Sequence, residues 1–247
     1  MEKKMLSRIL SSIDPELILE DIHAFTNCVM ARSLRTGMAM LVRNEVGNCG
    51  PARHLSYMGD MIGKPVLNVV PALFASGQDI KVTAGMAILS GAVPLPQNLR
   101  EGNAETPFEE MTHNMVTCFI GHFPMAERWR SEGRPVHIVE LRPGEGDIHW
   151  NDSREVLSRA ELVFITGLTL INGTFEEVIR RTPQAKQRVL MGPTVPPSEV
   201  FLDYGIDLVG STVVCDEKAA VRYYQHGGAG IKDAPAGALK TVNISRR

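Results

Sequence analysis

Several features that mark common protein classes are missing from this 247-residue sequence. Lys and Arg number 26 against 28 Asp and Glu, which leaves a net charge of -2. Proteins that bind nucleic acid or anionic membranes depend on an excess of positive charge, so we expect neither partner here. No apolar run approaches the roughly 20 residues of a membrane span, and the amphipathic N-terminal segment does not resemble a secretory signal. We therefore expect a cytoplasmic protein.

Cysteine is scarce, and its spacing excludes one type of metal site. The four cysteines lie far apart and form no CxxC pair, so a structural zinc site built on cysteine pairs is excluded. Three of the four have apolar neighbours, which favours reduced, buried thiols in a cytosolic protein. The four are Cys28, Cys49, Cys118 and Cys215.

The short motifs of several large enzyme classes are also absent. There is no P-loop, no nucleophile elbow, no HExxH pair and no GxGxxG fingerprint. The sequence therefore leaves open whether the protein is an enzyme.

In the second half of the chain, short apolar runs alternate with segments that carry helix-start signals. The expected strands cover residues 116–120, 135–141, 162–166, 188–191, 206–209 and 211–214. The expected helices cover residues 106–115, 124–132 and 152–160, a segment beginning at Thr174, and residues 198–204 and 217–225. Such alternation predicts a parallel sheet with helices on both faces, because right-handed crossovers place them there. The predicted fold class is α/β, with a Rossmann-like doubly wound domain over residues 106–247.

The first half has a different pattern. Residues 21–30 and 37–42 are two apolar stretches joined by a plausible hairpin connection at residues 32–36. Residues 80–91 predict a helix with a face of small residues, which allows close packing against a sheet. We expect a small α+β domain over residues 1–105, with the boundary in the polar segment 96–106.

Candidate ligand residues follow the strands of the predicted parallel sheet. In such sheets ligands bind outside the carboxyl ends of the strands, where the strand order reverses. We expect Thr174 to cap a helix whose start, together with Gly121 and Gly192, supplies backbone donors to an anion. The alternative is that Asn172 and Thr174 only satisfy the end of that helix.

Glu140 lies where Rossmann domains hold a ribose, at the end of the second strand and nineteen residues after Gly121. The turn after Gly121 carries Phe123 in place of the second glycine, which argues against binding of NAD and leaves an adenosine-containing cofactor such as S-adenosylmethionine as an alternative. Glu140 could instead pair with Arg142 or Arg128.

Histidines and carboxylates near the same edge form a candidate site for a divalent or heavy metal ion. Nitrogen and oxygen ligands suit such ions, although no ligand-pair motif supports the set. The competing interpretation is that each histidine is an ordinary hydrogen-bonded or surface residue. The candidate ligands are His122, Glu140, Asp147 and His149.

The motifs in the second half resemble the family labelled "putative heavy-metal chelation". The resemblance rests on Phe119-Ile-Gly-His-Phe-Pro124, Val139-Glu-Leu141, Ala160-Glu-Leu-Val-Phe-Ile-Thr-Gly167, Ile171-Asn-Gly-Thr-Phe-Glu-Glu177 and Met191-Gly-Pro-Thr194, in that order. It implies an enolase N-terminal-like domain followed by a Rossmann-like domain, with a ligand site in the cleft between them. The residues that it places in the site are Gly121, Phe123, Pro124, Glu140, Thr166, Asn172, Thr174, Gly192 and Pro193.

Three functions remain open from the sequence. The preferred hypothesis is a protein that binds a small anionic or metal-chelating ligand in the interdomain cleft. The alternatives are a transferase-like enzyme with an adenosine-containing cofactor, and a non-catalytic partner in metal uptake or cofactor assembly. The expected partner is a small molecule or a metal complex, and a homodimer is compatible with the sequence.

Overall fold

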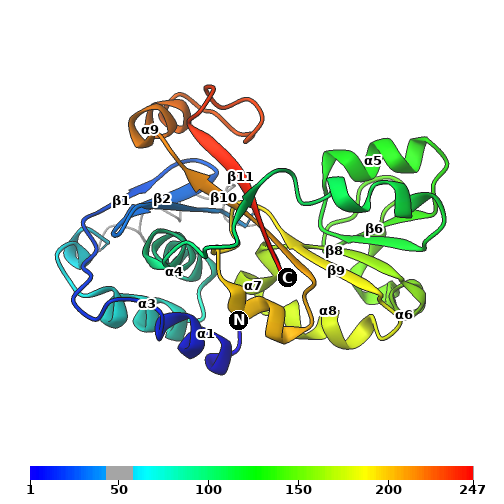
Figure 1. Ribbon diagram of the computed structural model, residues 1–247, viewed down its shortest axis with the longest axis horizontal. Coiled ribbons are helices and arrows are strands. Elements are labelled where there is room, and N and C mark those ends of the chain that lie inside the picture. Colours follow the sequence, from blue (N-terminus) through cyan, green and yellow to red (C-terminus); the bar gives the residue numbers. More distant parts are fainter. Residues whose placement is uncertain (43–57, 247) are drawn as a thin grey trace.

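An eight-stranded sheet forms the centre of the molecule (Figure 1). The computed structural model describes residues 1–42 and 58–246. The strand order is β4-β11-β10-β9-β8-β5-β6-β7, and the six strands from β10 to β7 run parallel. The parallel strands are β5 (Thr117–Ile120), β6 (Val136–Glu140), β7 (Ile148–His149), β8 (Leu162–Thr166), β9 (Gln187–Met191) and β10 (Leu208–Val214).

The order of these parallel strands is that of a Rossmann fold. The chain starts at β5, adds β6 and β7 on one side, and then returns to add β8, β9 and β10 on the other side. This is the order 3-2-1-4-5-6, whose reversal point lies between the first and fourth strands, here β5 and β8. The predicted α/β fold class, with its doubly wound sheet, is confirmed.

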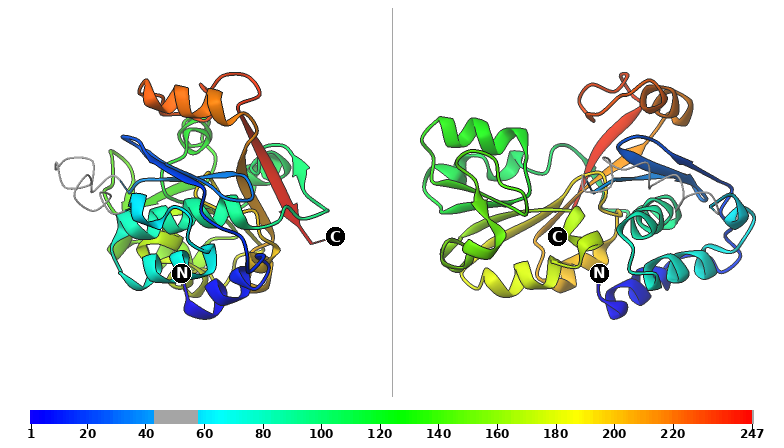
Figure 2. Two further views of the ribbon diagram at one scale, coloured as in Figure 1. Left: turned by 90° about the vertical axis from the view of Figure 1, so that its left-hand side faces the viewer. Right: turned by 180° about the vertical axis from the view of Figure 1, so that it is seen from behind.

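Helices cover both faces of this sheet (Figures 1 and 2). On one face, α5 (Pro124–Ser131) buries Trp129 against the stacked rings of Phe119 and Phe164, whose centroids are 4.5 Å apart. The opposite face is covered by α6 (Arg154–Arg159), α7 (Leu168–Asn172) and α8 (Phe175–Arg181). Because both faces are covered, the strands are the short apolar runs that the sequence showed.

The last part of the sheet differs from the prediction. The two strands expected at residues 206–209 and 211–214 are replaced by the single strand β10 (Leu208–Val214), and β11 (Leu239–Ser245) pairs with it in antiparallel orientation. The two-residue strand β4 (Arg100–Glu101), inside the expected linker, extends the sheet beyond β11. The sequence did not predict β11 because polar residues alternate along it, which is typical of a strand with one solvated face.

A second, three-stranded antiparallel sheet lies in the first half of the chain. It consists of β1 (Asp21–Ala24), β2 (Cys28–Arg32) and β3 (Thr36–Met40), so the expected stretch 21–30 is in fact two strands with a turn between them. The helix expected at residues 80–91 is α4 (Asp79–Ala92), and it packs on this sheet. A Cβ atom on Gly37 would lie 2.1 Å from the Gly91 nitrogen, so the two backbones meet as closely as small residues allow. The described part of this half also contains the helices α1 (Lys3–Leu10), η2 (Met58–Met61) and α3 (Val66–Ala75).

Two predicted helices are short 3-10 turns instead. Within the helix expected at residues 106–115, the structure has η3 (Thr106–Phe108) and η4 (Glu110–His113), and neither turn has a side-chain cap. The Glu109 carbonyl, which an α-helix would offer to the amide four residues later, accepts a hydrogen bond from Arg134. Residues 199–204 form η6 (Glu199–Tyr204), and η5 (Trp150–Asp152) and α9 (Glu217–Gln225) complete the elements of the described residues.

One hydrophobic core joins the two halves. It contains Val29 and Leu89 from the first half together with Val163 and Val209 from the large sheet. The Met40 amide donates to Thr194 Oγ1 (3.0 Å), which ties β3 to the segment after β9. The division into domains 1–105 and 106–247 stays a prediction. Within the described residues, no helix combines the length and the apolar character that crossing a membrane requires.

Candidate functional site

The reversal point of the sheet is tightly built. Gly121 follows β5 with φ +102°, a conformation that side chains rarely adopt. A Cβ atom there would lie 2.8 Å from Thr166 Cγ2, at the end of β8. Only glycine therefore lets the chain leave β5 beside Thr166 and turn toward α5.

His122 and Glu127 are brought together by the start of α5. Phe123 is the N-cap, and Pro124 occupies the first helical position, where its missing N–H group does no harm. His122 is then N′ and Glu127 is N4, two positions whose side chains commonly touch at helix starts. His122 Nε2 lies 3.4 Å from Glu127 Oε1.

Asp147 reaches the same point from the loop before β7. Its side chain is only 2% exposed, and Oδ2 accepts a hydrogen bond from the Gly144 amide (3.0 Å). Arg130 lies about one turn after Glu127 on α5. Its Nη1 atom is 2.9 Å from Asp147 Oδ1, and its Nη2 atom is 2.8 Å from Glu127 Oε2. These contacts, the Glu127 hydrogen bond first, raise the pKa of Arg130.

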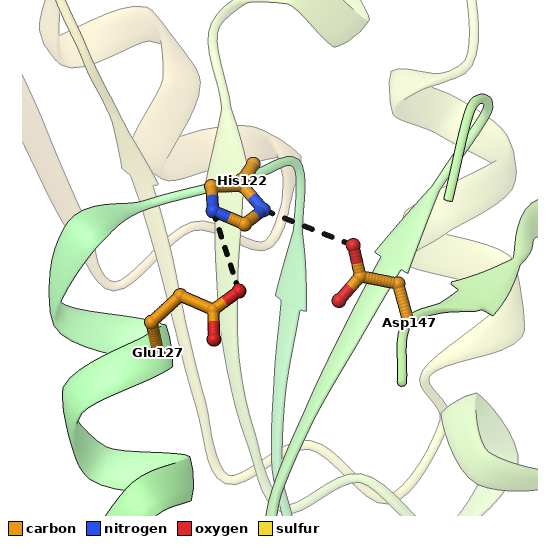
Figure 3. A group of neighbouring side chains, drawn as sticks. All are labelled: His122, Glu127 and Asp147. Atoms are coloured by element: carbon orange, nitrogen blue, oxygen red, sulfur yellow. Dashed lines mark ion pairs between the residues drawn. The ribbon is translucent and has the colours of Figure 1, made fainter. Parts of the chain in front are cut away.

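The result is a cluster of His122, Glu127 and Asp147, which we call the His122 cluster (Figure 3). One potential ligand atom from each residue lies within 4.8 Å of the others. Arg130 holds one oxygen of each carboxylate, and the second oxygen of each faces the imidazole. It is the one group of three potential metal ligands in residues 1–42 and 58–246.

The segment that carries this cluster also identifies the family. Residues 105–243 match DUF364, described as "Putative heavy-metal chelation". The chain belongs to this family.

Other DUF364 proteins support the fold. Crystal structures of proteins with unknown function from Desulfitobacterium hafniense and Pyrococcus horikoshii superpose with TM-scores of 0.78 and 0.75. Their sequence identities are 18% and 16%, and in both cases 98% of each chain is covered. An uncharacterized protein of Methanocaldococcus jannaschii is 29% identical over 119 residues, a match that spans 47% of this chain and 46% of that relative.

Two of the four proposed metal ligands in this DUF364 chain lie beside the cluster rather than in it. Glu140 and His149 are register partners on β6 and β7. Glu140 Oε2 accepts the Leu141 amide, and His149 Nδ1 accepts the Asn151 amide. The cluster itself contains His122 and Asp147 but neither Glu140 nor His149, and the metal role of all four stays a prediction.

The expected backbone donors at Gly121 and Gly192 are a wrong prediction. The Gly121 amide donates to the Val139 carbonyl (3.0 Å), and the Gly192 amide donates to the Gly210 carbonyl (3.1 Å). Both N–H groups are therefore used within the sheet. Pro193, half-buried, follows at the end of β9, next to the buried Thr194 that accepts from β3.

Asn172 and Thr174 make local contacts instead of joining the reversal point. The helix α7 was not predicted, and it places both residues in the turn between α7 and α8, on the sheet face opposite α5. Asn172 Oδ1 accepts from the amide (3.1 Å) and the hydroxyl (2.8 Å) of Thr174. Thr174 is the N-cap of α8 by position, but its side chain makes no capping hydrogen bond.

Sequence reasoning missed two residues of the site, Glu127 and Arg130. A usable signal was present, because Pro124 marks the first helical position and so assigns His122 to N′ and Glu127 to N4. The contact between Asp147 and Arg130 had no such signal, since it depends on a loop packing against α5.

Buried cysteines are unsuited to binding metal here. Burial raises the pKa of the Cys28 and Cys118 thiols to about 12, so both stay protonated at neutral pH. Metal ions bind the thiolate form. Cys215 is exposed and lies outside the His122 cluster, and Cys49 lies outside the described residues.

Proposed function

We propose that this protein binds a divalent transition-metal ion through His122, Glu127 and Asp147. The observation that carries the proposal is the convergence of three potential ligand atoms, from three separate positions in the chain, at the carboxyl edge of the sheet. A tetrahedral shell with bonds near 2.1 Å separates its ligands by about 3.4 Å. Small side-chain rotations bring atoms that lie within 4.8 Å to that spacing.

The ligand types favour borderline metals over the softest ones. One imidazole nitrogen and two carboxylate oxygens suit ions such as Zn²⁺, Co²⁺, Ni²⁺ and Mn²⁺, whereas Cu⁺ prefers sulfur. Two carboxylates and one guanidinium leave the group with a charge of about -1, which attracts a dication. The chelation named in the family description would then be nitrogen and oxygen chemistry.

Arg130 acts in this proposal as an outer support. Groups that hydrogen-bond to metal ligands fix the orientation of those ligands and tune affinity. Arg130 occupies the carboxylate oxygens that face away from His122, so the remaining oxygens are already aimed at the imidazole.

A metal held by three protein ligands keeps open coordination positions. His122 is about half exposed, so solvent molecules reach the cluster. We propose that a small anionic or chelating ligand completes the shell there, at the edge of the sheet that faces the first half of the chain.

Isothermal titration of tag-free, metal-stripped protein with Zn²⁺, Ni²⁺, Co²⁺ and Mn²⁺ tests the proposal. The His122→Ala and Asp147→Asn variants should each bind the preferred metal at least about tenfold more weakly. His113→Ala is the matched control, because His113 is an exposed histidine of η4 outside the cluster. Unchanged affinity in His122→Ala, or an equal loss in His113→Ala, would contradict the metal site.

A second candidate function follows from Glu140. In the observed strand order, Glu140 ends the second strand beside the reversal point, where Rossmann domains bind the ribose of a cofactor. The turn after β5 is less suited to a pyrophosphate, because Phe123 packs on Phe119, with ring centroids 5.7 Å apart. This candidate is therefore an adenosine-containing ligand such as S-adenosylmethionine.

Thermal-shift measurements separate the two candidates. A ligand present at a hundred times its dissociation constant stabilises a protein by about 2.7 kcal/mol. S-adenosylmethionine, NAD and nucleotides are the probes, and Glu140→Gln should abolish any shift while leaving metal affinity unchanged. The absence of a shift with every probe would remove the adenosine candidate.

A further inference from the structure

A surface hollow of about 610 Å³ lies along α9, remote from the His122 cluster. In Figures 1 and 2 this helix stands above the antiparallel sheet, well apart from α5. The hollow lies between the helix and the loop that follows it, and its volume is within the range of small-molecule sites. It is lined by Lys218, Ala219, Arg222, Tyr223, His226, Gly227, Gly228 and Pro235.

Three of the lining residues carry basic side chains on one face of the helix. Lys218, Arg222 and His226 are spaced four residues apart, which places them one above another over about 12 Å. No acidic residue lines the hollow, and none of the three makes an ion pair within the described residues. The nearby Glu217 is already engaged with Arg32. The positive charge of the hollow is therefore left for a ligand.

The remaining wall is formed by the loop after α9, which closes over Tyr223. The Tyr223 hydroxyl donates to the Gly230 carbonyl (2.9 Å), and the Gly228 amide donates to the Tyr223 carbonyl (3.0 Å). A Cβ atom on Gly228 would lie 2.4 Å from the Tyr223 ring, so glycine is needed for this approach. The loop thus supplies, with Tyr223, the part of the lining that carries no charge.

We propose that this hollow binds a small molecule that carries a phosphate group. A phosphate group offers several terminal oxygens to the charged donors along this helix face, whereas a carboxylate offers two in one plane. Arg222 provides the planar donor pair suited to such oxygens, and Lys218 adds a mobile point charge. The part of the ligand that carries no phosphate would contact the Tyr223 ring and Pro235. A nucleic acid is a poorer match, because it requires an extended basic surface on a protein of net charge -2.

Titration of metal-free protein with pyrophosphate in dilute buffer tests this site. Arg222→Gln should weaken pyrophosphate binding at least about tenfold, and Lys218→Gln and His226→Gln should weaken it less. Lys232→Gln is the matched control, since it removes one positive charge from the same loop without lining the hollow. His122→Ala should bind pyrophosphate normally, so failure of the metal proposal and failure of this one are distinguishable.

Three results would overturn the proposal. One is that pyrophosphate does not bind the folded wild-type protein. Another is that Lys232→Gln loses as much affinity as Arg222→Gln, because the effect would then reflect overall charge. The third is tighter binding of citrate than of pyrophosphate, which would assign the hollow to carboxylates.

Discussion

The carboxyl edge of the parallel sheet has an open half and a closed half. After β8 and β9 the chain is packed against the first half of the molecule, and Thr194 is only 2% exposed. A Cβ atom on Gly167 would lie 2.7 Å from Val195 Cγ2, which shows how little space is left. After β5 and β6 the chain meets solvent, where His122 is 49% and Leu141 is 45% exposed.

This difference indicates which part of the sheet edge can bind a ligand and which part only packs against the rest of the molecule. A ligand requires access to solvent and polar groups that the fold does not use. On the closed half, polar groups form hydrogen bonds within the fold. Thr194 Oγ1, for example, accepts a hydrogen bond from the Met40 amide. On the open half, one carboxylate oxygen each from Glu127 and Asp147 faces the imidazole of His122, which solvent reaches. The reversal point between β5 and β8 is the border between the two halves.

The largest effect is expected at that border. Gly121→Ala introduces a side chain at φ +102° and places its Cβ within 2.9 Å of two Thr166 atoms. Backbone strain and overpacking together should lower the free energy of unfolding by about 3 kcal/mol, measured by urea denaturation. Adding Thr166→Ser removes one of the two clashing carbons and should restore part of the loss. Full stability in Gly121→Ala would mean that the chain after β5 does not pack against Thr166 of β8 as tightly as the structure shows.

The closed half should lose stability when its polar link is removed. Thr194→Val keeps the shape of the side chain but leaves the Met40 amide without its acceptor, which costs about 2 kcal/mol. Chemical denaturation should show this loss, and Thr106→Val, at an exposed threonine, should change little. Equal effects in both variants would contradict the assignment of Thr194 as a link between β3 and the segment after β9.

The open half should be less sensitive, with one exception at Asp147. Asp147→Asn removes the charge that Arg130 faces at a nearly buried position, and we expect a loss of about 1–2 kcal/mol by denaturant titration. Asp152→Asn is the control, since Asp152 is an exposed acid of the next turn. A neutral Asp147→Asn variant would indicate that solvent screens the Arg130 contact.

The smallest effect concerns pH. Burial, and then the charge of Arg159, lowers the pKa of His137 on β6 below its ordinary value of 6.5. As pH falls through 6.5, the unfolded chain takes up a proton that the folded protein still resists, so the free energy of unfolding decreases until the folded pKa is passed. His137→Gln should flatten this part of the stability profile between pH 7 and 5. An unaltered profile would assign the acid sensitivity to other groups.

Much of the fold could be predicted from the sequence. The helix at α4, the buried Trp129 and the parallel strands β5, β6, β8 and β9 follow from local periodicity, because buried strands and amphipathic helices leave strong patterns. The strand β11 and the turn structure of residues 106–113 could not be predicted. Both depend on distant partners, β10 for the strand and Arg134 for the turns.

The candidate site was predicted only in part. The carboxyl-edge rule correctly led to His122 and Asp147 as neighbours, because it requires only the strand ends. The rule also suggested Asn172 and Gly192, whose polar groups have local or sheet partners. A sequence pattern indicates which residues end a strand, but it does not indicate whether their hydrogen-bonding groups are already occupied.

The sequence by itself determined the α/β class and most of the parallel strands, since these depend on short-range periodicity. Tertiary structure alone decided that the edge of the sheet is closed on one side of β5 and open on the other. It also decided that Arg130 turns two carboxylates toward His122, and that Lys218, Arg222 and His226 form no ion pair within residues 1–42 and 58–246. The physical reason is that solvent access and charge pairing are set by segments far apart in the chain.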